Sequence, residues 1–137
     1  MMLEAAQPEP PEQPTPVSRW FAALARRDRS ILAWERFFDS CDALLCPVAM
    51  TTAFPHCKPG SPLKVNGKEE SYWMLPAYGA VFNYSSHPAL AFPCGQDRDG
   101  LPVGLQLVGR KWSEARLLGI AAAIASLTGG FRRPPGY

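Results

Sequence analysis

Four cysteines and two histidines are the side chains of this 137-residue sequence that most readily bind metals or attack a substrate. They are Cys41, Cys46, Cys57, Cys94, His56 and His87. Zinc sites favour pairs such as C-x-x-C or H-x-x-x-H, and the sequence contains neither. A cysteine nucleophile needs a histidine to take its proton, but neighbouring side chains such as those of His56 and Cys57 point apart in an extended segment. We therefore expect free, structural cysteines, no metal and no cofactor.

Serine and lysine together could supply another nucleophile, because a lysine kept neutral by burial can accept the proton of a serine hydroxyl. The serine pair Ser85-Ser86 has no flanking glycines whose backbone N–H groups could stabilise an oxyanion. The lysines stand in polar or turn-like segments, at Lys58, Lys64, Lys68 and Lys111. No catalytic residue is predicted in this sequence.

The clearest structural pattern is a hairpin between Phe82 and Gly109. Residues 89–92 and 103–108 are apolar and rich in strand formers, which predicts two short strands. The Asp-Gly pair at Asp99-Gly100 tolerates positive φ and therefore favours a chain reversal between them. A mostly buried hairpin inside a larger sheet is expected.

Helical and strand patterns flank this hairpin. An apolar face repeats at helical spacing over residues 18–39, and a second one follows Ser113 up to Leu127. Ser113 is expected to cap the second helix, and Gly129 suits the position after it. The remaining predicted segments are a buried strand over 43–46, an irregular loop over 48–70 and an aromatic helical stretch over 71–84 that is broken near Pro76.

Composition limits the classes of function. The net charge of +2 does not predict a nucleic-acid or anionic-membrane surface, and no apolar run is long enough for a membrane span. The N-terminal sequence lacks the pattern of a secretory signal, so a cytoplasmic location is expected. Residues 1–16 are rich in Pro, Glu and Gln and are expected to form a flexible leader before a folded part at 17–137.

Several short motifs occur in an order that resembles the C-terminal portion of the amidase signature family, the Ser–cis-Ser–Lys amidases. They are Asp42-Ala43-Leu44-Leu45-Cys46-Pro47, Phe82-Asn83, Pro88-Ala89, Pro93, Gly95, Asp99-Gly100-Leu101-Pro102-Val103-Gly104, Gln106, Gly109, Glu114, Leu117-Leu118 and Arg133-Pro134-Pro135-Gly136. One departure is Ser86-His87, where the family has glycine and an apolar residue. The resemblance implies an α/β fold with a partial mixed β-sheet of three to four strands, including the hairpin, flanked by helices.

The resemblance also implies a function, hydrolysis of a carboxamide to a carboxylate and ammonia or an amine. The family's catalytic Ser–Ser–Lys residues lie in and before a GGSSGGS-like loop, and no such loop occurs among these 137 residues. The corresponding family region approaches the substrate, so Tyr78 and Phe82 are candidates to line an acyl pocket; the alternative is that they fill a core. The favoured hypothesis is a C-terminal amidase fragment that is inactive alone.

Two alternatives stay open. The chain could be a non-covalent subunit that completes an amidase with another chain, or a binding or scaffold module whose leader carries two P-x-x-P matches, Pro8–Pro11 and Pro11–Pro14. Strands that normally pair with absent neighbours would leave open edges and apolar faces. The expected partners are therefore an amidase N-terminal portion or a second copy, and the isolated chain is expected to be marginally stable or oligomeric.

Overall fold

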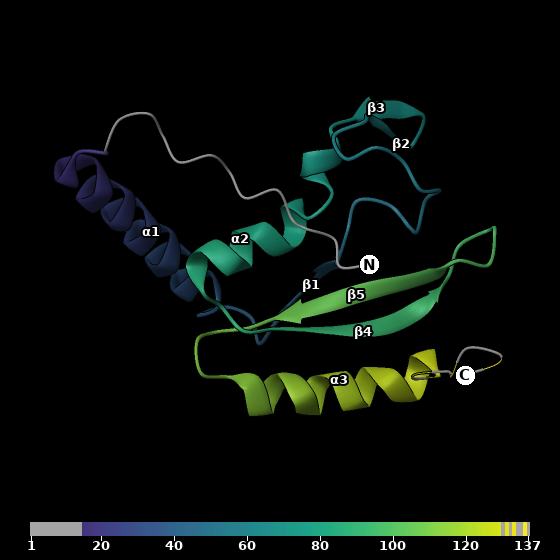
Figure 1. Cartoon of the computed structure of the whole chain (residues 1–137). Helices are drawn as coiled ribbons and strands as arrows, with labels where there is room; N and C mark the ends of the chain where they lie inside the picture. The colour runs from purple at the N-terminus through teal and green to yellow at the C-terminus, as the bar shows by residue number, and fades with distance from the viewer. Residues whose placement is uncertain (1–14, 130, 132, 134–135, 137) are drawn as a thin grey trace.

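The computed structural model describes residues 15–129, 131, 133 and 136, which leaves most of the proposed leader outside the described residues. Groups of strands are separated by helices along the chain (Figure 1). Their bounds are α1 Val17–Phe37, β1 Leu44–Pro47, β2 Leu63–Val65, β3 Lys68–Glu70, the 3-10 helix η1 Tyr72–Met74, α2 Ala77–Ser85, β4 Ala89–Gln96, β5 Pro102–Val108 and α3 Glu114–Thr128. The predicted α/β class is confirmed: a small sheet that contains the hairpin is flanked by helices.

The main sheet has the strand order β1-β5-β4, so β5 lies in its centre. The predicted hairpin is β4 and β5, which pair antiparallel from Ala89 opposite Val108 to Gln96 opposite Pro102. Strand β4 has a bulge between Pro93 and Gly95. Pro93 has no N–H to donate, and it is tolerated here because β4 is an edge strand. Within the described residues, β1 and β4 pair only with β5, so each has an open outer edge.

The last residues of β5 are buried on both faces of the sheet. Leu107 contacts Leu117 and Ala121 of α3, which lies along the hairpin (Figure 1). Val108 points the other way, into a cluster with Phe38 and Phe82. These alternate directions follow from the two-residue period of a strand, so a single strand joins both cores.

The link from β5 to α3 depends on a close approach at Gly109. A Cβ built on this glycine would lie 2.5 Å from Ser113 Oγ and 2.9 Å from Leu117 Cδ2. Ser113 precedes α3 as predicted, but its side chain does not cap the helix. Its hydroxyl instead donates to the carbonyl oxygen of Arg110 at 2.6 Å, within the tight turn that Gly109 begins. Gly129 ends α3 in the left-handed conformation, as predicted.

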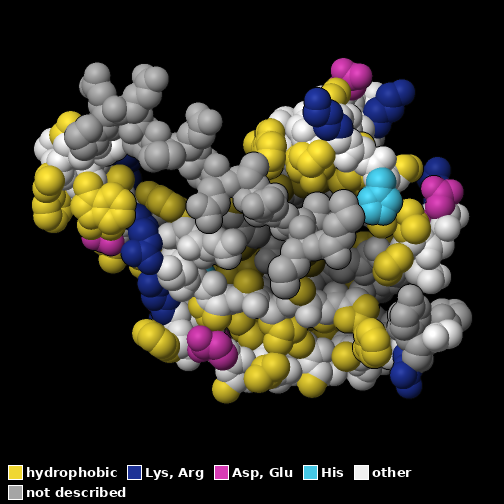
Figure 2. All heavy atoms as spheres, viewed as in Figure 1, with side chains coloured by type: hydrophobic (Ala, Val, Ile, Leu, Met, Phe, Trp, Pro, Cys, Tyr) yellow, Lys and Arg dark blue, Asp and Glu magenta, His cyan; other side chains and the backbone are white. Residues whose placement is uncertain are grey.

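Helix α1 is attached by its C-terminal end and contains no buried residue. Near that end Trp34 packs against Phe82 of α2, with ring centroids 5.1 Å apart. At the other end Trp20 and Phe21 are 60% and 63% exposed, and hydrophobic side chains are visible over this end of α1 and along α3 in Figure 2. Among the described residues, no helix combines the length and apolar character needed to cross a bilayer.

The segment predicted as an irregular loop over 48–70 contains a second hairpin, so that prediction was incomplete. Strands β2 and β3 pair antiparallel around Asn66-Gly67. Both turn residues have positive φ, 52° for Asn66 and 79° for Gly67, as a two-residue hairpin turn requires. The Asn-Gly pair was a sufficient signal for this hairpin, although the flanking strands are only three residues long. The predicted break near Pro76 is confirmed, because it separates η1 from α2.

Candidate functional site

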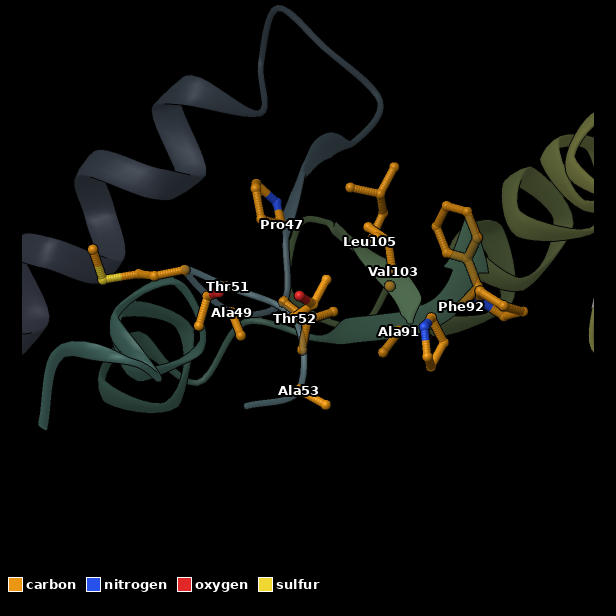
Figure 3. Close-up of a pocket in the computed structure, with 14 residues that line it drawn as sticks. Pro47, Ala49, Thr51, Thr52, Ala53, Ala91, Phe92, Val103 and Leu105 are labelled. Carbon is orange, nitrogen blue, oxygen red and sulfur yellow. The ribbon is translucent and has the colours of Figure 1, made fainter. Parts of the chain in front are cut away.

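A pocket of about 630 Å³ lies beside the hairpin and is here called the sheet pocket. One wall is the segment that follows β1, and the other is formed by parts of β4 and β5 (Figure 3). Its lining consists of residues 47–53, 91–93 and 102–105. The pocket thus lies between the segment that follows β1 and the surface of the hairpin.

Two contacts hold the first wall against the sheet near β1. Gln106, buried in β5, donates from Nε2 to the carbonyl oxygen of Pro47 at 2.9 Å. Val48 then lies close to β5, since a Cβ on Gly104 would be 3.5 Å from Val48 Cγ2. A Cβ at position 104 would thus be in ordinary van der Waals contact with the wall, which places the wall directly against the strand.

Asp97, in the turn between β4 and β5, holds the far end of the same wall. Its Oδ2 accepts a hydrogen bond from the Thr52 hydroxyl at 2.8 Å, and its Oδ1 accepts from the backbone N–H groups of Asp99 and Leu101. These donors favour the charged carboxylate, so the Thr52 bond and then the Leu101 bond lower the pKa of Asp97. One side chain therefore orders the turn and fastens the pocket wall to it.

The lining of the sheet pocket is suited to binding and not to bond cleavage. Its polar side chains are the hydroxyls of Thr51 and Thr52, and none of its residues is an acid, a base or a cysteine. Such a lining can accommodate an apolar group with one or two hydrogen bonds, as many small-molecule sites do. It supplies no nucleophile and no general base.

The predicted site residues Tyr78 and Phe82 both lie on α2, and neither lines the sheet pocket. The ring of Phe82 is buried between α1 and β5, where it contacts Trp34. Tyr78 is exposed. The structure therefore does not bring these two side chains together at one surface, and a role in an acyl pocket stays a prediction.

The four cysteines are free thiols, as expected. Burial raises the pKa of Cys46, which keeps this thiol protonated and unreactive despite the side-chain contact with Gln106. Across the part of the chain that the structure describes, no three His, Cys, Asp or Glu side chains gather as a metal site would require.

A polar cluster that the sequence reasoning did not predict lies between α1 and α2. It consists of Glu35, His87 and Ser85, joined by hydrogen bonds of 2.9 Å and 3.1 Å. The available signal was the departure from the family pattern at Ser86-His87, where a histidine replaces an apolar residue. That departure is visible in the sequence, but the distant partner Glu35 could not be found from spacing alone.

Comparison with known proteins identifies the fold. A family model described as Amidase matches residues 11–118, most of the chain. The chain belongs to the amidase family. The resemblance seen in the sequence is therefore confirmed, and the hairpin, α2 and the start of α3 all lie in the matched region.

Two relatives illustrate the relation. The chain is 40% identical over 120 residues to a fatty acid amide hydrolase of Oryza sativa subsp. indica, covering 84% of this chain and 19% of that protein. It is 32% identical over 116 residues to a fatty acid amide hydrolase of Medicago truncatula, covering 85% and 19%. The chain thus spans about a fifth of the length of these curated relatives.

Solved amidase structures share the arrangement of helices and strands. A crystal structure of an amidase superimposes with a TM-score of 0.74 at 23% identity, over 84% of this chain and 26% of that one. The structure of 6-aminohexanoate cyclic dimer hydrolase gives a TM-score of 0.66 at 27% identity, over 85% and 26%. The fold described above is therefore part of the amidase fold.

Proposed function

We propose that this chain forms the C-terminal part of an amide hydrolase. The reaction adds water across the C–N bond of a carboxamide and yields a carboxylate and ammonia or an amine. The match of the Amidase family model over residues 11–118 is the observation that carries this proposal. The fold similarity to solved amidases supports it, because the superposition covers most of the chain.

The catalytic groups of this reaction are proposed to lie outside these 137 residues, so the chain alone hydrolyses no amide. Ser85 belongs to the one serine pair, yet it is fully buried and hydrogen-bonded to His87, so no substrate can reach it. The sheet pocket contains no titratable side chain. A serine activated by a neutral lysine must then be contributed by another segment or chain.

The role proposed for the sheet pocket is to form one wall of an apolar binding site in the complete enzyme. Its threonine hydroxyls and largely apolar lining fit the uncharged part of an amide substrate. Tyr78 remains a proposed pocket residue because its ring is exposed. Phe82 is proposed to act there only indirectly, since its ring fills the core beneath α2.

The partner proposed for this chain is the remainder of an amidase domain, either covalently joined or as a separate subunit. The open outer edges of β1 and β4 favour this proposal, because unpaired backbone N–H and C=O groups readily pair with another strand. Self-association through the same edges is the alternative. The P-x-x-P matches of the scaffold hypothesis lie outside the described residues, and binding to SH3-like domains stays its test.

A chimera tests the proposed function directly. The 120 residues of the Oryza sativa fatty acid amide hydrolase that align with this chain would be replaced by its own sequence, and fatty acid amide hydrolysis measured. We expect hydrolysis above that of the same chimera with the host's nucleophilic serine changed to alanine. A folded chimera that is no more active than this control would contradict the proposal.

The isolated chain and a mixture separate the two kinds of partner. The 137-residue chain alone is expected to release no ammonia or amine from a panel of simple amides. Addition of the host hydrolase shortened to end before the aligned region restores hydrolysis if this chain acts as a non-covalent subunit. An active chimera with an inactive mixture indicates that covalent continuity is required. Hydrolysis by the isolated chain would contradict the assignment of catalysis to another segment.

A further inference from the structure

Glu35, His87 and Ser85 form a continuous hydrogen-bonded cluster at the C-terminal end of α1. Ser85 is 0% exposed and His87 5%. His87 Nε2 lies 3.1 Å from Glu35 Oε1, and His87 Nδ1 lies 2.9 Å from Ser85 Oγ. An ionised carboxylate only accepts hydrogen bonds, so Nε2 carries the hydrogen and Nδ1 of the neutral ring accepts from the serine hydroxyl. A neutral histidine therefore satisfies every polar atom in the cluster.

The carboxylate of Glu35 joins three separate segments. Glu35 lies on α1, while His87 lies in the connection between α2 and β4. The same carboxylate accepts a hydrogen bond from the backbone N–H of Lys111 at 3.0 Å and pairs with Arg110 Nε at 3.3 Å, both in the link between β5 and α3. These polar contacts therefore attach α1 alongside the packing of Trp34 against Phe82.

We propose that the Glu35–His87–Ser85 cluster makes the attachment of α1 dependent on pH, with neutral His87 holding the helix and proton uptake at Nδ1 releasing it. The proton binds to the Nδ1 lone pair, so Nδ1 can no longer accept the hydrogen bond from Ser85 and becomes a donor to Ser85 Oγ instead. The serine hydroxyl must then turn its hydrogen elsewhere, although the residue is completely buried. A buried positive ring, together with a buried serine hydroxyl hydrogen that has lost its acceptor, destabilises the attached state relative to the released one.

The charges around the cluster do not stabilise the protonated ring enough to offset its burial. Burial lowers the pKa of His87 more than the hydrogen bond and charge of Glu35 raise it, and the positive charge of Lys111 lowers it further. On the side of the core the ring meets Phe38, with ring centroids 5.7 Å apart. The other charged groups nearby are Arg110, which pairs with Glu35 and Asp39, and Arg27 of α1, which donates to the hydroxyl of Ser86.

The direction of the pH effect follows from proton linkage. A detached α1 leaves His87 in water with a pKa of about 6.5, whereas the attached state has a lower pKa. The released state therefore binds more protons below about pH 6.5, and attachment weakens there by up to tenfold per pH unit until the lower pKa is reached. Above about pH 6.5 the attachment keeps its full stability.

Hydrogen exchange on the full 137-residue chain tests the proposal. Amide protection is compared between residues 30–37 of α1 and the middle of α3, at pH 7.5 and pH 5.5, after correction for intrinsic exchange rates. We expect protection in α1 to fall several-fold at the lower pH while protection in α3 stays constant. The change His87→Gln should abolish this pH dependence. His56→Gln is the matched control, because His56 is the second histidine and is exposed in a loop, so the wild-type dependence should remain.

Titration of the histidine rings by NMR gives a measurement that needs no stable His87 variant. The His56→Gln chain leaves a single histidine signal, and its proton uptake is compared with the loss of α1 protection. Uptake in step with that loss supports the proposal. A ring that protonates while α1 stays protected overturns it, and so does equal loss of protection in α1 and α3.

Discussion

The two long helices, α1 and α3, differ in how much of their apolar surface the chain itself covers. Leu117 and Ala121 of α3 are buried against Leu107 of β5. Helix α1 is longer and has an apolar repeat of its own, yet no residue in it is buried. Both helices show the amphipathic pattern that predicts a helix, but only α3 has its partner strands within the described residues.

This difference indicates that an apolar repeat predicts which face of a helix is apolar, but not which element of the fold covers that face. The face of α3 is covered by a hairpin that immediately precedes it in sequence. The exposed end of α1 has no corresponding cover in the described part of the chain, and the main sheet has open edges at β1 and β4. These uncovered surfaces are the ones that the proposed partner, the remainder of an amidase domain, would cover.

The largest effect on stability is expected when a buried side chain is shortened in the core between α3 and β5. Leu117→Ala should lower the free energy of unfolding by about 2–5 kcal/mol, because it leaves a cavity between α3 and β5. The adjacent Leu118 is the matched control: it is 60% exposed whereas Leu117 is 1% exposed. Leu118→Ala should change the unfolding free energy by less than about 0.5 kcal/mol. Urea denaturation measures both, and equal losses would contradict the assignment of the core.

The next effect concerns the close approach of Gly109 to α3. Gly109→Ala should destabilise the chain by about 1–3 kcal/mol, since the added methyl group overlaps Ser113 Oγ and Leu117 Cδ2. Gly119, in the middle of α3, has open space around its Cα. Gly119→Ala should instead stabilise the chain by about 0.5–1 kcal/mol through helix propensity. Thermal unfolding of the two variants should show shifts of opposite sign; a destabilised Gly119→Ala would contradict the open surroundings.

Much of this packed region could be predicted from the sequence. The strands of the hairpin, the Asp99-Gly100 reversal and the extent of α3 all follow from short-range patterns. The Thr52 contact of Asp97 could not be predicted, because it joins residues 45 positions apart. The same holds for Glu35 and His87, which are 52 positions apart. Long-range polar pairs depend on how whole helices and strands are arranged in space, and the local sequence pattern does not predict that arrangement.

The candidate site was harder to predict for a related reason. The family resemblance of residues 71–84 suggested an acyl pocket, but Tyr78 and Phe82 are four positions apart and share one face of α2, so helical spacing does not separate them. Phe82 is buried because Trp34 of α1 packs against it, whereas Tyr78, one turn nearer the start of α2, remains exposed. The sheet pocket consists of small and apolar residues from three segments, whose types carry no chemical signal in the sequence.

A smaller effect is expected at the junction between the two regions. Ser86 ends α2 in the left-handed conformation, with φ of 57°, at the position where the family pattern has glycine. Ser86→Gly should stabilise the chain by about 1 kcal/mol, because glycine adopts this conformation without strain. Ser86→Ala, the matched control, loses the same hydrogen bond from Arg27 as the glycine variant but keeps the strain, so it should not stabilise. Denaturation midpoints compare them; an equal gain for alanine would show that strain is not the cause.

The smallest effect on stability is expected at the outer end of α1, and it tests the comparison most directly. The double change Trp20→Ser and Phe21→Ser should alter the unfolding free energy by less than about 0.5 kcal/mol, because both side chains are exposed. If this surface is covered by another copy in the isolated chain, the same change should lower its sedimentation coefficient at high concentration.

Arg19→Ser with Arg26→Ser is the matched control on the same helix, since it removes two exposed polar side chains and leaves the apolar ones. Loss of association in the aromatic variant alone would assign self-association to the uncovered face of α1. Equal association of the unmodified chain, the aromatic variant and the arginine variant would instead assign self-association to the open edges of β1 and β4. A large loss of stability in the aromatic variant would instead show that α1 is packed within its own chain, and the contrast with α3 would no longer hold.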